Sequence, residues 1–88
     1  MGDYSITLAR SARKELERLP SSTVARILSK VESLAEIPRP SGVTKLQGQM
    51  GLWRMRVGDY RIIYSIDDLS KKVDISLIRH RRDVYRDL

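Results

Sequence analysis

The segment from Leu52 to Tyr64 constrains the fold most strongly, because apolar and polar residues alternate on both sides of a central Gly-Asp pair. Alternation with a period of two residues is typical of β-strands, and a Gly-X pair between two such runs is typical of a hairpin. Gly58-Asp59 fits a two-residue type II′ turn. The resulting register pairs Val57 with Tyr60, Arg56 with Arg61, Met55 with Ile62, and Trp53 with Tyr64.

The polar face of this hairpin carries three arginines. Arg56 lies directly opposite Arg61, and Arg54 lies two residues away on the same strand. Like charges facing each other across two strands destabilise the pairing by a few tenths to about 1 kcal/mol. We therefore predict that an anion binds on this face. The alternative interpretation is a solvated face whose arginines pair with Asp74 or with glutamates.

The composition limits the class of protein. A chain of 88 residues with 41% apolar residues suits one small domain, residues 1–88, with one core. It has no cysteine and one histidine, so we expect no disulfide, no metal site and no cofactor. No apolar run is long enough to span a membrane, and Met1-Gly2-Asp3 does not resemble a signal peptide. We expect a soluble, cytoplasmic protein without a membrane partner.

The formal net charge of +6 predicts a polyanionic partner. This charge alone does not separate RNA from DNA or from an acidic protein. Many of the cations fall on the predicted strands or directly after them: Arg54, Arg56, Arg61, Arg79, Arg81 and Arg82. A folded basic surface therefore describes the chain better than a basic tail does.

The first half of the chain predicts a strand at residues 4–8 and then two helices. Ser11 is expected to cap the first helix, whose apolar face is Ala12, Leu16 and Leu19, and Pro20 ends it. A second helix starts at Ser21 or Ser22 and ends before Pro38 and Pro40. Its apolar stripe has helical spacing and consists of Val24, Ile27, Leu28, Val31, Leu34 and Ala35. We interpret this helix pair as a layer that covers a sheet.

A loop over residues 38–51 precedes three predicted strands at 52–57, 60–66 and 72–78. A four-residue connection, Asp68 to Lys71, keeps Ile66, Tyr64 and Ile62 on one face with Val73, Ile75 and Leu77. In this register residue 79 lies beside Tyr60, and Trp53 and Tyr64 belong to the core. The pattern predicts an α+β fold in which an N-terminal strand and a helix pair pack on an antiparallel sheet.

The same register brings Arg79-His80-Arg81-Arg82 close to the arginines of the hairpin. Cleaving RNA without a metal requires a base for the 2′-hydroxyl, charge stabilisation at phosphorus and an acid for the 5′-oxygen. Arginine supplies the charge stabilisation, because its guanidinium pairs bidentately with phosphate oxygens. No glutamate follows Glu36, so His80 and Tyr85 are the candidate groups for proton transfer.

Three segments together resemble the RelE branch of the RelE/ParE toxin superfamily. They are Lys45-Leu46-Gln47-Gly48, the hairpin from Leu52 to Tyr64, and the stretch from Ile78 to Arg86. The resemblance covers nearly the whole chain in order. It implies the microbial RNase-like (RelE) fold and a ribosome-dependent, metal-independent mRNA endonuclease that cleaves A-site codons through attack of the 2′-hydroxyl. It also implies a RelB-like antitoxin partner, with operator DNA bound only by the toxin–antitoxin complex.

The resemblance also implies roles for individual residues. Arg54 and Arg56 correspond to basic residues that hold the message, Arg61 to an arginine that stabilises the transition state, and Tyr85 to a stacking or acid/base residue. A second catalytic arginine position falls on Arg79, His80 or Arg81, and Lys45 and Arg82 are candidate RNA-binding residues. Two alternatives stay open, namely a ParE-like toxin that inhibits DNA gyrase and a non-catalytic module that binds nucleic acid and antitoxin.

Overall fold

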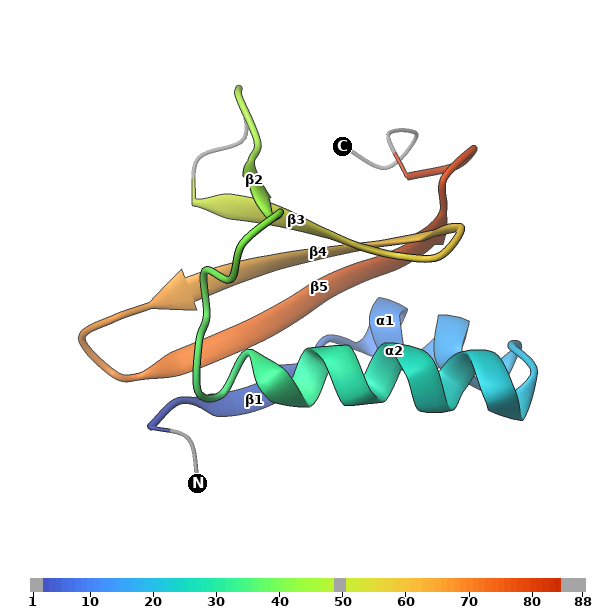
Figure 1. Cartoon of the computed structure of the whole chain (residues 1–88), viewed down its shortest axis with the longest axis horizontal. Helices are drawn as coiled ribbons and strands as arrows, with labels where there is room; N and C mark the ends of the chain where they lie inside the picture. Colours follow the sequence, from blue (N-terminus) through green and yellow to red (C-terminus); the bar gives the residue numbers. More distant parts are fainter. Residues whose placement is uncertain (1–2, 49–50, 85–88) are drawn as a thin grey trace.

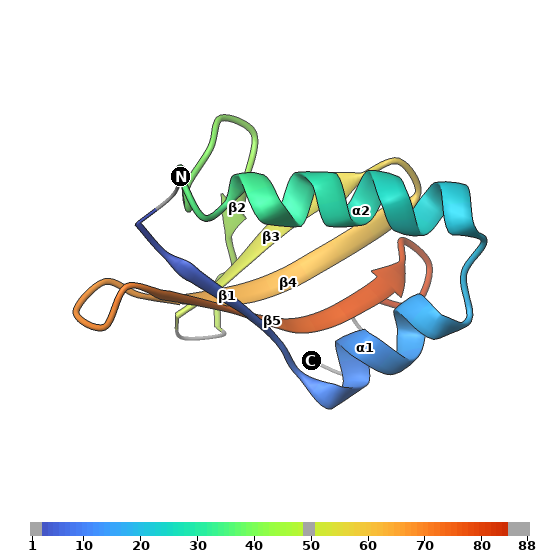
Figure 2. The same ribbon diagram turned by 90° about the horizontal axis from the view of Figure 1, so that it is seen from below.

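The computed structural model describes residues 3–48 and 51–84. These residues form two helices and a five-stranded sheet of order β1-β5-β4-β3-β2. In chain order the elements are β1 (Ser5–Leu8), α1 (Arg10–Glu17), α2 (Ser21–Ser33), β2 (Thr44–Lys45), β3 (Leu52–Val57), β4 (Tyr60–Asp67) and β5 (Lys72–His80). Both helices lie on the same side of the sheet (Figure 1). In Figure 2, α2 crosses the middle of the sheet and α1 lies beside β5.

The sheet is mixed. β1 pairs with β5 in parallel, and the pairs β5–β4, β4–β3 and β3–β2 are antiparallel. The predicted α+β fold, with a strand and a helix pair packed on a largely antiparallel sheet, is confirmed. β2 adds a short strand at Thr44–Lys45, inside the stretch that we expected to be a loop.

The hairpin of β3 and β4 has the predicted register, with Val57 opposite Tyr60 and Arg56 opposite Arg61. Gly58 has a φ of +58°. Among the described residues Lys71 is the sole non-glycine with a positive φ, so the φ of Asp59 is negative. A positive φ followed by a negative one is the type II′ pattern, which confirms the turn.

β5 carries a β-bulge that the sequence pattern did not reveal. Tyr64 pairs with Ile75, whereas the preceding residue of β4, Ile63, pairs with Leu77. Ser76 is therefore one extra residue in β5, and beyond it the two faces of the strand exchange their residues.

The bulge makes part of the predicted β4–β5 register wrong. The four-residue connection is confirmed, but His80, and not residue 79, lies opposite Tyr60. Arg79 lies opposite Arg61 instead. Ile78 takes the fully buried position that we predicted for Leu77, because a slip of one residue turns every following side chain to the other face.

The ends of the helices also differ from the prediction. The residue before α1 is Ala9, and no side chain caps this helix. Ser11 lies inside its first turn, where its hydroxyl accepts a hydrogen bond from Arg79. α2 begins at Ser21 as expected but ends at Ser33, well before Pro38. Neither helix of the described chain has the length and apolar character to cross a membrane.

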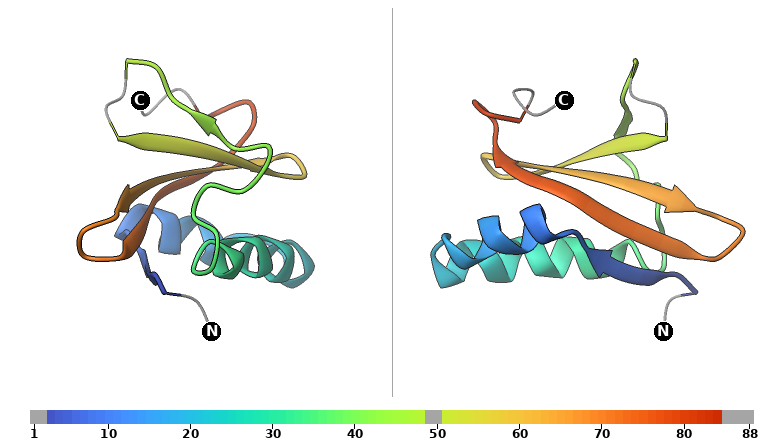
Figure 3. Two further views of the ribbon diagram at one scale, coloured as in Figure 1. Left: turned by 60° about the vertical axis from the view of Figure 1, so that its left-hand side comes forward. Right: turned by 180° about the vertical axis from the view of Figure 1, so that it is seen from behind.

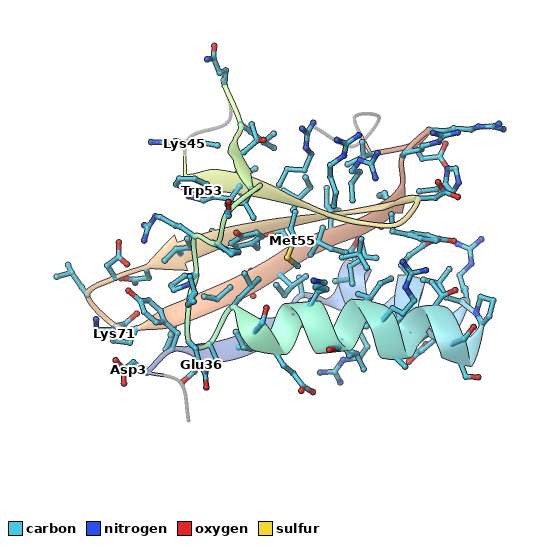
Figure 4. The ribbon with its side chains drawn as sticks, viewed as in Figure 1. Asp3, Glu36, Lys45, Trp53, Met55 and Lys71 are labelled. Atoms are coloured by element: carbon cyan, nitrogen blue, oxygen red, sulfur yellow. The ribbon has the colours of Figure 1, made fainter. Side chains whose placement is uncertain are left out.

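The main core lies between the helices and one face of the sheet. Its fully buried members include Ile27 of α2, Leu34 directly after α2, and Ile62 and Tyr64 of β4. Trp53 packs against this core, which confirms its assignment to the apolar face. Met55 is directed from β3 toward α2 in Figure 4. Ile63 and Val84 are buried as well but do not belong to this core.

A polar network joins three segments at the end of the sheet that lies away from the Gly58-Asp59 turn. The carboxylate of Asp68 accepts hydrogen bonds from the Tyr4 hydroxyl at 2.6 Å and from Arg39 Nη2 at 2.9 Å. The guanidinium of Arg39 lies over the Trp53 ring, 5.3 Å from its centre. Together these contacts hold the segment after α2 against β1 and the β4–β5 turn.

Candidate active site at the hairpin turn

Arginines occupy neighbouring positions on three strands near the Gly58-Asp59 turn. Arg56 of β3 is opposite Arg61 of β4, and Arg61 is opposite Arg79 of β5. Arg54 lies two residues along β3 from Arg56 and is half-buried. Since the residues that alternate with them, such as Met55 and Ile62, belong to the core, these arginines occupy the sheet face that points away from the helices.

Arg61 is the most firmly held of these side chains. Only 9% of its surface is exposed. Its Nη1 donates hydrogen bonds to the carbonyl oxygens of Gly58 and Tyr60, each at 3.0 Å. Because Gly58 lies in the tight turn and Tyr60 directly follows it, the turn fixes the position of the guanidinium. The remaining N–H groups of Arg61 are therefore presented in a preorganised geometry.

The electrostatic surroundings of Arg61 are strongly positive. Its pKa is lowered first by burial and then by the charges of Arg56, Arg54 and Arg81, while Asp59 acts in the opposite direction. Desolvation and like charges both disfavour a cation. An anion bound among these side chains would offset both effects, so the arrangement suits a phosphate group.

Arg81 reaches this cluster because the chain turns back at the end of β5. The Arg81 N–H donates to the carbonyl of Asp59 at 2.7 Å, and the Asp83 N–H donates to the carbonyl of His80 at 2.8 Å. Figures 1 and 3 show the segment after β5 passing onto the sheet face opposite the helices. Val84 is buried at the end of this segment.

The guanidinium of Arg79 is engaged elsewhere. Its Nη2 donates to the Ser11 hydroxyl at 3.0 Å, and its Nη1 donates to the carbonyl of Ile78 at 2.9 Å. Arg79 is thus opposite Arg61 in the sheet but binds α1 with its side chain. We name the four arginines that surround the turn, Arg54, Arg56, Arg61 and Arg81, the arginine cluster.

His80 lies on the other face of the sheet. It is paired with Tyr60, which packs against the main core. The two rings meet edge to face, with centres 5.5 Å apart and planes at 84°. The imidazole Nδ1 accepts a hydrogen bond from the Arg82 N–H at 3.3 Å. The sequence placed His80 next to the arginines, and the bulge in β5 turns it away from them.

The other described candidates, Lys45 and Arg82, are not part of the arginine cluster. Lys45 pairs with Trp53, and Figure 4 shows both at the end of β3 that is far from the turn. Arg82 is exposed in the segment after β5. Tyr85 lies outside the described residues. Within the described ranges, no three His, Cys, Asp or Glu side chains gather as the ligands of a metal ion would.

Sequence reasoning missed a groove between α2 and β3 next to the cluster. The groove has a volume of about 400 Å³ and is lined by Ala25, Arg26, Ser29, Lys30, Arg56, Val57 and Gly58. Arg26 approaches so closely that its Nη2 would lie 3.3 Å from a Cβ at position 58. The positive φ favours glycine at this position, and the close approach adds little to that preference because the end of the Arg26 side chain is flexible. Arg26 and Lys30 look like ordinary surface residues of a helix, so no signal in the sequence marks them.

Comparisons with known proteins agree with this architecture. Residues 6–85 match the family described as ParE toxin of type II toxin-antitoxin system, parDE. Toxin RelG of Mycobacterium tuberculosis is 31% identical over 84 residues, which cover 94% of this chain and 97% of RelG. Toxin RelE of the same organism is 33% identical over 84 residues, covering 94% of this chain and 87% of that toxin.

A solved structure shows the same fold. The toxin in the archaeal RelE–RelB complex from Pyrococcus horikoshii superposes with a TM-score of 0.80 and 32% identity, over 90% of this chain and 96% of that one. Sequence and structure thus agree over nearly the full length of the toxin. The chain belongs to the RelE/ParE superfamily of type II toxin–antitoxin toxins, in its RelE branch.

Proposed function

We propose that this toxin is an endoribonuclease that cleaves mRNA in the ribosomal A site without a metal ion. The observation that carries the proposal is the anchored position of Arg61, whose guanidinium is held by the carbonyls of Gly58 and Tyr60 and surrounded by three further arginines. A buried arginine among like charges is costly for the fold and is suited to a phosphate that carries extra negative charge.

In the proposed reaction the 2′-oxygen of one nucleotide attacks the adjacent phosphorus. The bond from phosphorus to the 5′-oxygen of the next nucleotide breaks, leaving a 2′,3′-cyclic phosphate and a 5′-hydroxyl. Arg61 stabilises the charge that develops on the phosphorane oxygens, and Arg54, Arg56 and Arg81 bind the phosphate from its sides. Arginine is a poor proton acceptor, so proton transfer belongs to other groups, for which the sequence offers His80 and Tyr85.

The proposed partners are the ribosome with mRNA in its A site and a RelB-like antitoxin. The groove between α2 and β3 supports the second partner, because Arg26, Lys30 and Arg56 line it beside apolar atoms of Ala25 and Val57. An acidic, amphipathic helix is complementary to such a groove. The P. horikoshii relative forms a complex with RelB. We place the toxin in the cytoplasm, where translation occurs, and operator binding in the toxin–antitoxin complex alone.

Primer extension on a message in a translating extract tests this function. The toxin is added with and without ribosomes, and we expect cuts at codon positions that require ribosomes. Arg61→Ala should reduce the cleavage rate by about 100- to 1,000-fold, as removal of a preorganised contact to a developing oxyanion does. Arg61→Lys is the matched control, which keeps the charge but not the planar fork, and it should restore only part of the rate. Full activity of Arg61→Ala would contradict the assigned site.

Gyrase inhibition is the second candidate function, because the matching family is described as the ParE toxin. The same extract distinguishes the two. Arrested replication with intact messages would indicate gyrase, and cut messages with active replication would indicate the nuclease. A protein that binds RNA or antitoxin but does neither would be the non-catalytic module.

A further inference from the structure

The side-chain Nδ1 and the backbone carbonyl of His80 both accept hydrogen bonds within one tight turn. Its Nδ1 accepts from the Arg82 N–H at 3.3 Å, and its carbonyl accepts from the Asp83 N–H at 2.8 Å. Both bonds bend the chain directly after β5. The turn that they build covers residues 80–83 and ends at the buried side chain of Val84.

The ring of His80 is also fixed from the other side. It meets the Tyr60 ring edge to face at 5.5 Å, and Tyr60 packs on the main core. An imidazole nitrogen that accepts an N–H hydrogen bond carries no proton, so in a neutral ring the proton is on Nε2. This orientation and this tautomer suit a structural acceptor, and the ring faces the helix side of the sheet rather than Arg61.

The turn has a direct consequence for the arginine cluster. Within it, the Arg81 N–H lies 2.7 Å from the carbonyl of Asp59, a residue of the hairpin turn. In this position the charge of Arg81 lowers the pKa of Arg61. Arg61 has its own anchors on Gly58 and Tyr60. Arg81 is held through its backbone, by its own hydrogen bond to Asp59 and by the turn over residues 80–83 that His80 builds.

We propose that His80 is a positioning residue that holds Arg81 beside Arg61, and that it neither donates nor accepts a proton in the reaction. This proposal rests on the proposed nuclease function. It removes His80 from the candidates for proton transfer and gives Arg81 the second arginine position of the site. Arg61 keeps its own anchors when the turn over residues 80–83 is lost. A substitution of His80 should therefore weaken phosphate binding more than it slows the chemical step.

Two near-identical amides separate positioning from proton transfer. The side-chain oxygen of His80→Asn lies close to the position of Nδ1 and can accept from the Arg82 N–H, whereas the amide of His80→Gln lies closer to the position of Nε2. We expect His80→Asn to cleave within about 3-fold of the wild type and with the same pH profile. His80→Gln and His80→Ala should lose about 10- to 100-fold in kcat/KM, mostly through KM. Loss of activity in His80→Asn equal to that in His80→Gln, or a changed pH profile in His80→Asn, would overturn the proposal.

A spectroscopic measurement tests the same geometry without any activity. In the full-length toxin, ¹⁵N shifts of the imidazole at about pH 8 should show Nδ1 unprotonated and the proton on Nε2. The Arg82 amide should exchange with solvent more slowly in the wild type and in His80→Asn than in His80→Ala. A protonated Nδ1, or equal exchange of the Arg82 amide in the wild type, His80→Asn and His80→Ala, would contradict the hydrogen bond from Arg82 to His80. If no variant and no wild-type sample cuts RNA while these signals are present, the proposed function fails, whereas the turn that His80 builds stands.

Discussion

Arg61 and Arg39 lie near opposite ends of the sheet in opposite electrostatic surroundings. Arg39 pairs with the carboxylate of Asp68 at 2.9 Å, and this hydrogen bond raises the pKa of Arg39. Arg61 is buried next to Arg56, Arg54 and Arg81, and its pKa is lowered. Its anchors are backbone carbonyls, which hold the guanidinium without cancelling its charge.

The partners of the guanidinium distinguish a structural arginine from a functional one. A carboxylate partner makes Arg39 part of the fold, since it ties the loop after α2 to the β4–β5 turn. Carbonyl partners make Arg61 rigid and leave its charge for a ligand. A surface ion pair contributes about 0 to 1 kcal/mol, whereas a preorganised cation at a developing oxyanion changes a rate by about 100-fold or more. The two arginines should therefore respond to substitution in opposite ways.

The largest difference in cleavage and in stability is expected when an arginine is replaced by glutamine at each end of the sheet. Arg56→Gln should lower cleavage by about 10-fold or more, because one charge of the cluster is lost. It should leave the melting temperature equal or slightly higher, because the repulsion between Arg56 and Arg61 is relieved. Arg39→Gln should leave cleavage unchanged and lower the melting temperature by about 1 to 5 °C. Cleavage assays and thermal unfolding check both.

A double variant gives the control for this pair. The effects of Arg56→Gln and Arg39→Gln should add, because Arg39 pairs with Asp68 whereas Arg56 acts on Arg61 near the other end of the sheet. A clear loss of cleavage in Arg39→Gln would contradict the structural role of Arg39. A marked loss of stability in Arg56→Gln would contradict the functional role of Arg56.

Tyr64→Phe tests the Arg39 end of the sheet with an intermediate effect. The Tyr64 hydroxyl donates to the carbonyl of Pro38 at 2.9 Å, next to Arg39, and burial raises the pKa of Tyr64 to about 12. The hydroxyl thus stays protonated at every pH used for assays. Removing it should lower the free energy of unfolding by about 1 kcal/mol, measured by urea denaturation, with cleavage unchanged. A reduced cleavage rate would show that this end of the sheet contributes to the site.

The smallest effect is expected from Asp68→Asn, and it concerns the melting temperature at acidic pH. Hydrogen bonds from Arg39 and Tyr4 lower the pKa of Asp68 to about 2, against about 3.9 for an unfolded aspartate. A lowered pKa means that the stabilisation is complete above about pH 4 and is lost as the pH falls through about 2. Between these values the melting temperature of Asp68→Asn should fall less steeply than that of the wild type. Parallel curves would show that Asp68 is not the group that titrates.

The order of residues is sufficient to predict the β3–β4 hairpin and the arginines that face each other across it. A two-residue turn leaves one register, and alternation then decides which side chains share a face. For this reason Arg56 opposite Arg61 followed from the order of residues within a short segment. The main apolar faces of α2 and β4 followed in the same way, from local periodicity.

The register at the end of β5 and the partners of its side chains depend on contacts between distant parts of the chain. The bulge at Ser76 depends on pairing with β4 along the whole strand, and no local sequence pattern predicts it. It exchanged the faces of Arg79 and His80. His80 accepts a hydrogen bond in the turn after β5, and the guanidinium of Arg79 donates to Ser11 of α1. The pairing of Arg39 with Asp68 likewise joins residues that are 29 positions apart. Local rules fix the register of a tight hairpin such as β3–β4, but long-range packing decides the register of β5 and which charged side chains find a partner or remain for a ligand.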